Sequence, residues 1–116
     1  MNEPFSISSE RLSGTLGLVV LTGEVDIATA PRFRECMIEL LDAGVEKLVV
    51  DLSGVTFIDS TALGVLIGGV RRVRGVGGAM TLVVTSRPVQ RVLSLTGLDR
   101  VFAIHATREA AVEALA

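Results

Sequence analysis

The chain has 116 residues, 49% of them hydrophobic, which is the size of one compact domain with a buried core. Its net charge of −2 without any run of like charge argues against non-specific nucleic-acid binding, and the lack of Trp and Tyr argues against an aromatic platform for bases or sugars. Cys36 is the only cysteine, which excludes an intrachain disulfide and fits a reducing cytosol.

The sequence carries no predicted export or membrane signal. Its first ten residues, MNEPFSISSE, lack a basic segment followed by an apolar one. Glycines and charges interrupt every apolar stretch well short of a membrane span. We therefore expect one soluble domain over residues 1–116, located in the cytoplasm.

The first predicted elements form a β-hairpin. Residues 5–12 alternate in polarity as a strand does, and residues 15–22 are rich in β-branched side chains. Ser13 and Gly14 between them are typical of a hairpin turn. The segment after the second strand breaks this pattern.

A helix and a buried strand are expected next. The helix begins near Pro31, with Thr29 or Asp26 as its cap, and ends at Gly44. Residues 47–52, KLVVDL, are apolar almost throughout, which indicates a strand covered on both faces. The predicted apolar face of the helix consists of Phe33, Met37, Ile38, Leu40 and Leu41.

The remaining sequence alternates between helices and strands. We expect a helix over 60–74, a strand over 80–85, a helix over 87–97, a strand over 100–105 and a final helix capped by Thr107. The full order is β-β-α-β-α-β-α-β-α, which predicts an α/β fold with a mixed, mainly parallel sheet. The inward residues of the helix over 87–97 are predicted to be Val89, Val92, Leu93 and Leu95.

Three polar residues, Asp59, Ser60 and Thr61, interrupt an apolar neighbourhood where the strand and its loop lead into the helix over 60–74. One interpretation is capping, in which Asp59 or Ser60 accepts a hydrogen bond from the first helical turn. The other is a switch, because an exposed hydroxyl at a helix start can be phosphorylated. The added charge would change the surface strongly while leaving the fold intact.

An enzyme is not indicated. Ser60 lacks the G-x-S-x-G frame of a nucleophile elbow, and His105, the only histidine, lies far along the chain at the end of a late strand. The chain has no phosphate-binding G-x-x-x-x-G-K-[ST] loop and no residue cluster with metal-ligand spacing, so we expect no cofactor.

Three segments resemble the bacterial anti-sigma factor antagonists of the STAS-domain family. The central one is DLSGVTFIDSTALGVLIGGVRRVRGVGG, with LTGEVDIATAP before it and TGLDRVFAIHATREAAVEAL after it. The similarity runs nearly end to end, and the D-S-[ST]-x-L-G core is its most specific part. It implies the STAS fold, a sheet of four to five strands with helices packed on it.

The resemblance also implies a function in partner switching during stress response or sporulation. The unphosphorylated antagonist would bind an anti-sigma factor that is also a serine kinase, and so release a sigma factor for transcription. The kinase would then phosphorylate the antagonist, and a serine phosphatase would restore it. No direct contact with nucleic acid or membrane is implied, and we expect a monomer or weak dimer.

The resemblance assigns roles to individual residues. Ser60 is the expected phosphoacceptor, flanked by Asp59 and Thr61. Ala62 stands where many relatives have glycine. The expected partner surface consists of Asp59, Thr61, Ala62, Gly23, Glu24 and Asp26. A ligand- or nucleotide-binding STAS module is the alternative.

Gly64 and Gly68 lie four residues apart in the same predicted helix, with Gly69 beside them. Because glycine in mid-helix costs stability, they suggest a close approach. That approach is either internal packing or a face presented to a partner kinase.

Overall fold

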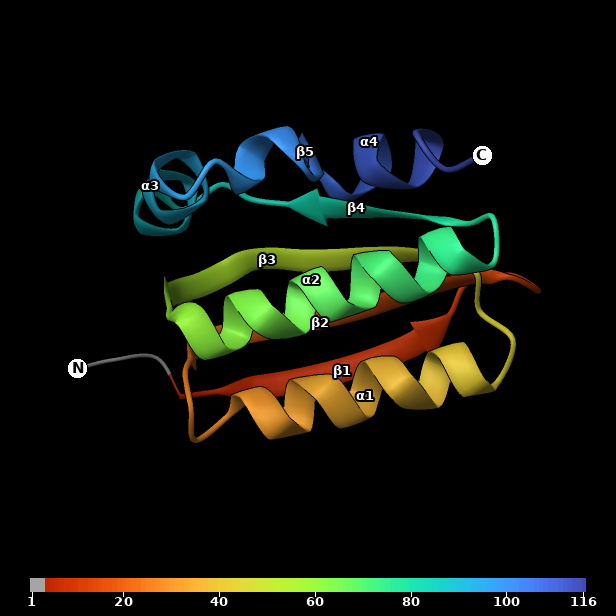
Figure 1. The fold of residues 1–116 in the computed structure, drawn as a ribbon, viewed down its shortest axis with the longest axis horizontal. Helices are drawn as coiled ribbons and strands as arrows, with labels where there is room; N and C mark the ends of the chain where they lie inside the picture. The colour runs from red at the N-terminus through yellow and green to blue at the C-terminus, as the bar shows by residue number, and fades with distance from the viewer. Residues whose placement is uncertain (1–3) are drawn as a thin grey trace.

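The structure is a computed structural model that describes residues 4–116, and it confirms the predicted order of elements (Figure 1). A short 3₁₀ helix at Leu98–Arg100 precedes the last strand. The strands are β1 (Ser6–Arg11), β2 (Leu16–Val25), β3 (Lys47–Ile58), β4 (Ala79–Val83) and β5 (Ala103–His105), and the α-helices are α1 (Ala30–Asp42), α2 (Ser60–Gly75), α3 (Arg87–Leu95) and α4 (Arg108–Glu113).

The five strands lie in one sheet in the order β1-β2-β3-β4-β5. β1 and β2 form the antiparallel hairpin, with Ser6 opposite Thr22, and every other neighbouring pair is parallel. Parallel neighbours need a crossover connection, which α1, α2 and α3 supply. The predicted mixed, mainly parallel sheet is therefore confirmed, with five strands.

One face of the sheet carries the larger part of the core. α1 and α2 lie side by side over it, as Figure 1 shows. Their buried side chains pack with inward residues of the strands because both helices present an apolar face to the sheet. The core residues that α1, α2 and α3 contribute to this cluster include Phe33, Met37, Leu66, Val70, Val89 and Leu93.

The other face is covered by the short helix α4. Ala111 and Leu115 pack there against Leu18, Val49 and Val83 of the three central strands. A six-residue helix does not persist in water by itself, so α4 depends on these tertiary contacts.

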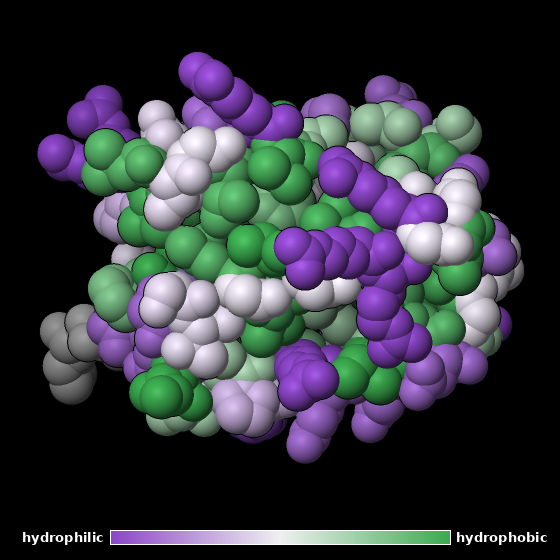
Figure 2. Space-filling model, in the orientation of Figure 1, coloured by the Kyte–Doolittle hydropathy of each residue, from purple (hydrophilic) through white to green (hydrophobic). Residues whose placement is uncertain are grey.

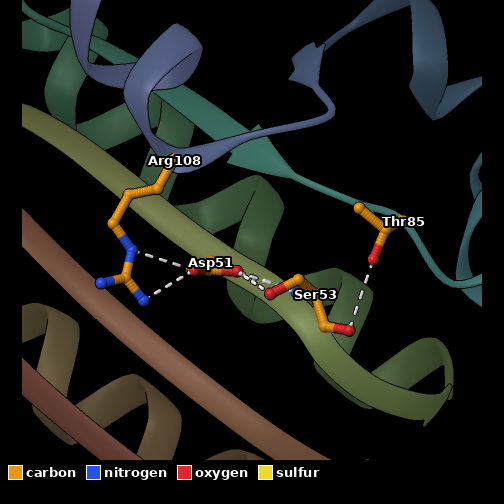
Figure 3. A network of polar contacts seen from close by, with 4 residues as sticks. All are labelled: Asp51, Ser53, Thr85 and Arg108. Atoms are coloured by element: carbon orange, nitrogen blue, oxygen red, sulfur yellow. Dashed lines mark hydrogen bonds and ion pairs between the residues drawn. The ribbon is translucent and has the colours of Figure 1, made fainter.

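Asp51 joins α4 to the sheet through an ion pair. This buried carboxylate accepts two hydrogen bonds from the Arg108 guanidinium, at 3.1 and 2.9 Å, and two from Ser53, through its hydroxyl at 2.6 Å and its backbone N–H at 2.9 Å. Figure 3 shows Arg108 and Ser53 reaching Asp51 from opposite sides. Burial by itself raises the pKa of Asp51, but the bonds from Ser53 and Arg108 outweigh burial and lower the pKa overall.

β3 is twice the predicted length, so the prediction of a loop between this strand and α2 is wrong. β3 continues to Ile58 because its second half pairs with β2 after two register shifts, ending with Val25 opposite Ile58. β4 leaves β3 after the pair Asp51–Val83, so residues 53–58 have a strand on one side only. Asp59 is thus the only residue between β3 and α2.

The predictions near the carboxyl terminus are confirmed in part. The last strand is restricted to residues 103–105, because the 3₁₀ turn occupies part of the predicted range. Leu95 is 78% exposed, so its predicted inward position is wrong, whereas Val89 and Leu93 are fully buried. The predicted cap of α4 is confirmed, since the Thr107 hydroxyl accepts a hydrogen bond from the Ala110 N–H at 3.1 Å.

Candidate functional site

The Asp59 carboxylate links the start of α2 to the loop between β2 and α1. Its Oδ1 accepts a hydrogen bond from the Ala62 N–H at 3.0 Å, which confirms the predicted cap. Its Oδ2 accepts a second bond from the Ile27 N–H at 3.0 Å, and its own N–H donates to the Val25 carbonyl. Asp59 therefore fixes two neighbouring segments at the edge of the sheet where β2 and β3 end.

The turn before α1 is held by Asp26 and Thr29, but neither caps the helix as predicted. The Asp26 Oδ1 accepts hydrogen bonds from the Ala28 and Thr29 N–H groups, and the Thr29 hydroxyl accepts one from the Asp26 N–H at 2.9 Å. Thr29 occupies the N-cap position without a side-chain bond to the first turn. The two side chains instead close the turn that precedes the helix, and Asp26 is half-buried.

Ser60 and Thr61 are the first two residues of α2, and both are exposed. Within residues 4–116, neither hydroxyl takes part in a hydrogen bond with another side chain or with the backbone. The first turn of a helix carries unpaired N–H groups and a partial positive charge, which suit an added anion. Ser60 is therefore accessible for modification at a position that tolerates negative charge.

Two residues expected at the partner surface lie inside the molecule. Ala62 is fully buried, and its N–H donates to Asp59. Gly23 is also buried and has a φ of 83°, a conformation that other residues rarely adopt. Both residues are therefore largely shielded from solvent in this conformation, and their predicted place in the partner surface stays a prediction. Glu24, half-buried, accepts a hydrogen bond from the Thr29 hydroxyl through its carbonyl.

Two exposed apolar residues beside the site were not predicted from the sequence. Ile27 is 74% exposed, and Phe57, which pairs with Glu24 across β2 and β3, is 47% exposed. An isoleucine within a polar turn was a signal for Ile27. Phe57 was missed because its segment was assigned to a loop, although the β-branched and aromatic run at residues 55–58 favours a strand.

The site offers little for catalysis. His105 ends β5, its Nε2 is buried without a hydrogen-bond partner, and among the described residues no hydrogen bond joins it to Ser60. The described part of the chain contains no group of three or more His, Cys, Asp and Glu residues that could hold a metal ion. In residues 4–116 no helix combines the length and apolarity that crossing a membrane requires.

Comparison with known proteins identifies the family. The STAS domain model matches residues 6–111. The anti-sigma-B factor antagonist of Bacillus subtilis is 35% identical over 95 residues, which are 82% of this chain and 86% of the relative.

Solved structures share the fold. An anti-sigma factor antagonist from Mycobacterium paratuberculosis superposes with a TM-score of 0.84 at 26% identity, covering 97% of this chain and 94% of the other. The Bacillus cell fate determinant SpoIIAA in its phosphorylated form has a TM-score of 0.76 at 21% identity, over 96% and 100% of the two chains. The relatives from Bacillus subtilis and Mycobacterium paratuberculosis are both named as anti-sigma factor antagonists, which are regulatory binding proteins rather than enzymes. The chain belongs to the STAS-domain family of anti-sigma factor antagonists.

Proposed function

We propose that this protein is an anti-sigma factor antagonist that phosphorylation of Ser60 switches off. The observation that carries the proposal is the exposed Ser60 hydroxyl, which has no hydrogen-bond partner among residues 4–116, beside a carboxylate that two hydrogen bonds hold in place. The unphosphorylated protein would bind an anti-sigma factor serine kinase in the cytoplasm and release the sigma factor. A serine phosphatase would reset it.

The physical basis of the switch is charge at a fixed surface. A phosphoryl group adds a charge of about −1.5 to −2 at neutral pH. The start of α2 favours this charge, while Asp59 at the adjacent position opposes it, so the fold persists and the local potential changes sharply. SpoIIAA has the same fold in a phosphorylated form, which supports the view that the fold accommodates such a group.

The partner surface would consist of the exposed and half-buried groups around Ser60. Asp26 and Asp59 contribute negative charge to it, and Ile27 and Phe57 contribute apolar area. Mixed apolar and charged surfaces of this kind suit a transient protein partner. Thr61, exposed on the next position of α2, belongs to the same surface.

Calorimetric titration with the anti-sigma factor tests this proposal. Ser60→Ala should bind as the parent does, while Ser60→Asp and Ser60→Glu should bind at least tenfold more weakly. Circular dichroism should be unchanged in all three, because the Ser60 side chain is exposed. Equal affinity of the acidic and alanine variants contradicts the switch.

A further inference from the structure

A groove runs between α1 and α2 on the outer side of the two helices. Its volume is about 700 Å³, and its walls are mainly apolar. It extends along α2 from Thr61 to Arg72, which is about 16 Å, or three helical turns. The residues that form its apolar lining include Ile38, Leu41, Val65, Gly64 and Gly68.

The glycines of α2 separate into two kinds in the structure. A Cβ atom on Gly69 would lie 2.7 Å from Met80 and 2.9 Å from Met37, so this glycine is required by internal packing. Gly64 and Gly68 are exposed, and a Cβ atom on either would meet nothing within 4 Å. No packing within the described residues explains them, although each costs helix stability.

We propose that this groove is the seat of an amphipathic helix of the anti-sigma factor. The proposal rests on the proposed function. Two packed helices leave ridges and a furrow that accept a third helix, and a helix in a groove is a common mode of peptide recognition. Gly64 and Gly68 have no side chains on the α2 side of the groove, so the backbones of the partner helix and of α2 can approach closely.

The position of the groove relative to Ser60 favours this occupant. Thr61, next to Ser60, lines one end, so a helix in the groove continues the partner surface around the phosphorylation site. At the rim stand Arg34, Glu35 and Arg72, of which Arg72 forms an ion pair with Asp42 at 3.1 Å. Figure 2 shows pale and green atoms along α2, with purple side chains gathered toward its carboxyl end. The two cations, Arg34 and Arg72, are matched by Glu35 and Asp42, so the mainly apolar walls, and not a net charge at the rim, favour the apolar face of a helix.

Leucine substitutions at the two exposed glycines test the proposal. Gly64→Leu and Gly68→Leu place a side chain in the groove from positions where a Cβ atom would meet nothing within 4 Å, and they should raise the melting temperature because leucine favours a helix over glycine. Affinity for the anti-sigma factor that phosphorylates Ser60 should fall at least tenfold. Gly75→Leu is the matched control: it is exposed, lies outside the groove in the same helix, and should bind as the parent does.

The outcomes separate this proposal from the proposed function. If Ser60→Asp weakens binding but both leucine variants bind normally, the groove is not the seat and the switch survives. If no kinase phosphorylates Ser60, the proposed function fails first. Sedimentation of the free protein tests whether a second copy of this chain occupies the groove instead. A dimer that Gly64→Leu abolishes would assign the groove to that second copy and overturn the proposal.

Discussion

The Asp59 carboxylate and the Ile27 N–H are joined by a 3.0 Å hydrogen bond across 32 positions of the chain. Because Asp59 also caps α2, one side chain sets the relative position of the helix that bears Ser60 and the turn that bears Asp26. The affinity of a partner that contacts both segments should therefore depend on Asp59, even where the partner does not touch this residue.

Asp59→Ala should lower both stability and partner affinity. It removes a cap and a second hydrogen bond, which together correspond to about 1–3 kcal/mol of unfolding free energy. Urea denaturation measures this loss. Asp42→Ala is the control, since it removes only an exposed ion pair with Arg72 and should change stability by less than about 0.5 kcal/mol. Equal stability of the two variants would show that the Asp59 bridge contributes nothing.

Arg108→Ala should destabilise the protein by leaving the buried Asp51 without its cation. Losing one partner of a fully buried pair costs about 3–5 kcal/mol, and since the Arg108 side chain is 45% exposed we expect about 1–3 kcal/mol at pH 7. The comparison variant is Arg91→Ala, on the exposed side of α3. A loss in Arg108→Ala no larger than in Arg91→Ala would contradict a stabilising role for the pair.

The same ion pair predicts a pH dependence. The pKa of Asp51 is lowered in the folded protein, so its contribution to stability is complete above the unfolded value of about 4 and is lost as the pH falls through the folded value. Between roughly pH 5 and pH 2, the range that spans this titration, the stability of Asp51→Asn should change less than the stability of the parent protein. Parallel acid profiles of the two proteins would be evidence against this assignment.

Asp26→Asn should weaken binding to the anti-sigma factor while leaving the melting temperature unchanged. The asparagine oxygen can still accept the bonds from Ala28 and Thr29, so only the charge is removed. Calorimetry and thermal unfolding of the same preparation separate the two effects. A lowered melting temperature with unchanged affinity would restrict Asp26 to shaping the turn.

Much of this fold follows from local pattern, whereas the site depends on pairing between distant segments. The helix over 60–74 and the cap at Asp59 were predictable because periodicity and capping act within a few residues. The second half of β3 was not, because Ser53 and Gly54 interrupt the apolar run as a turn would, whereas in the folded chain the strand continues through them by pairing with β2.

The same reasoning applies to two polar contacts. Asp51 lies in the apolar strand KLVVDL, but its partner Arg108 lies 57 residues away, and only the folded chain identifies the pair. Thr29 and Asp26 were candidates for a cap, and the structure uses both in the preceding turn, because Asp26 bonds to the nearest backbone N–H groups first.

The isolated protein should show no catalytic turnover. Catalysis by Ser60 needs a base within hydrogen-bond reach, and the adjacent Asp59 carboxylate is already committed to two backbone N–H groups. Hydrolysis of ATP, GTP and ester substrates should not exceed that of Ser60→Ala. Robust activity that this substitution removes would place the protein among enzymes.

Intact-mass measurement decides whether Ser60 is the phosphorylated residue. The protein is incubated with ATP and each serine kinase of the anti-sigma type from the same genome, with Ser60→Ala and Thr61→Ala in parallel. We predict that one kinase adds a single phosphoryl group to the parent and to Thr61→Ala, that Ser60→Ala stays unmodified, and that peptide mapping places the group on Ser60. Absence of any modification, or a group that persists in Ser60→Ala and disappears in Thr61→Ala, would contradict this account.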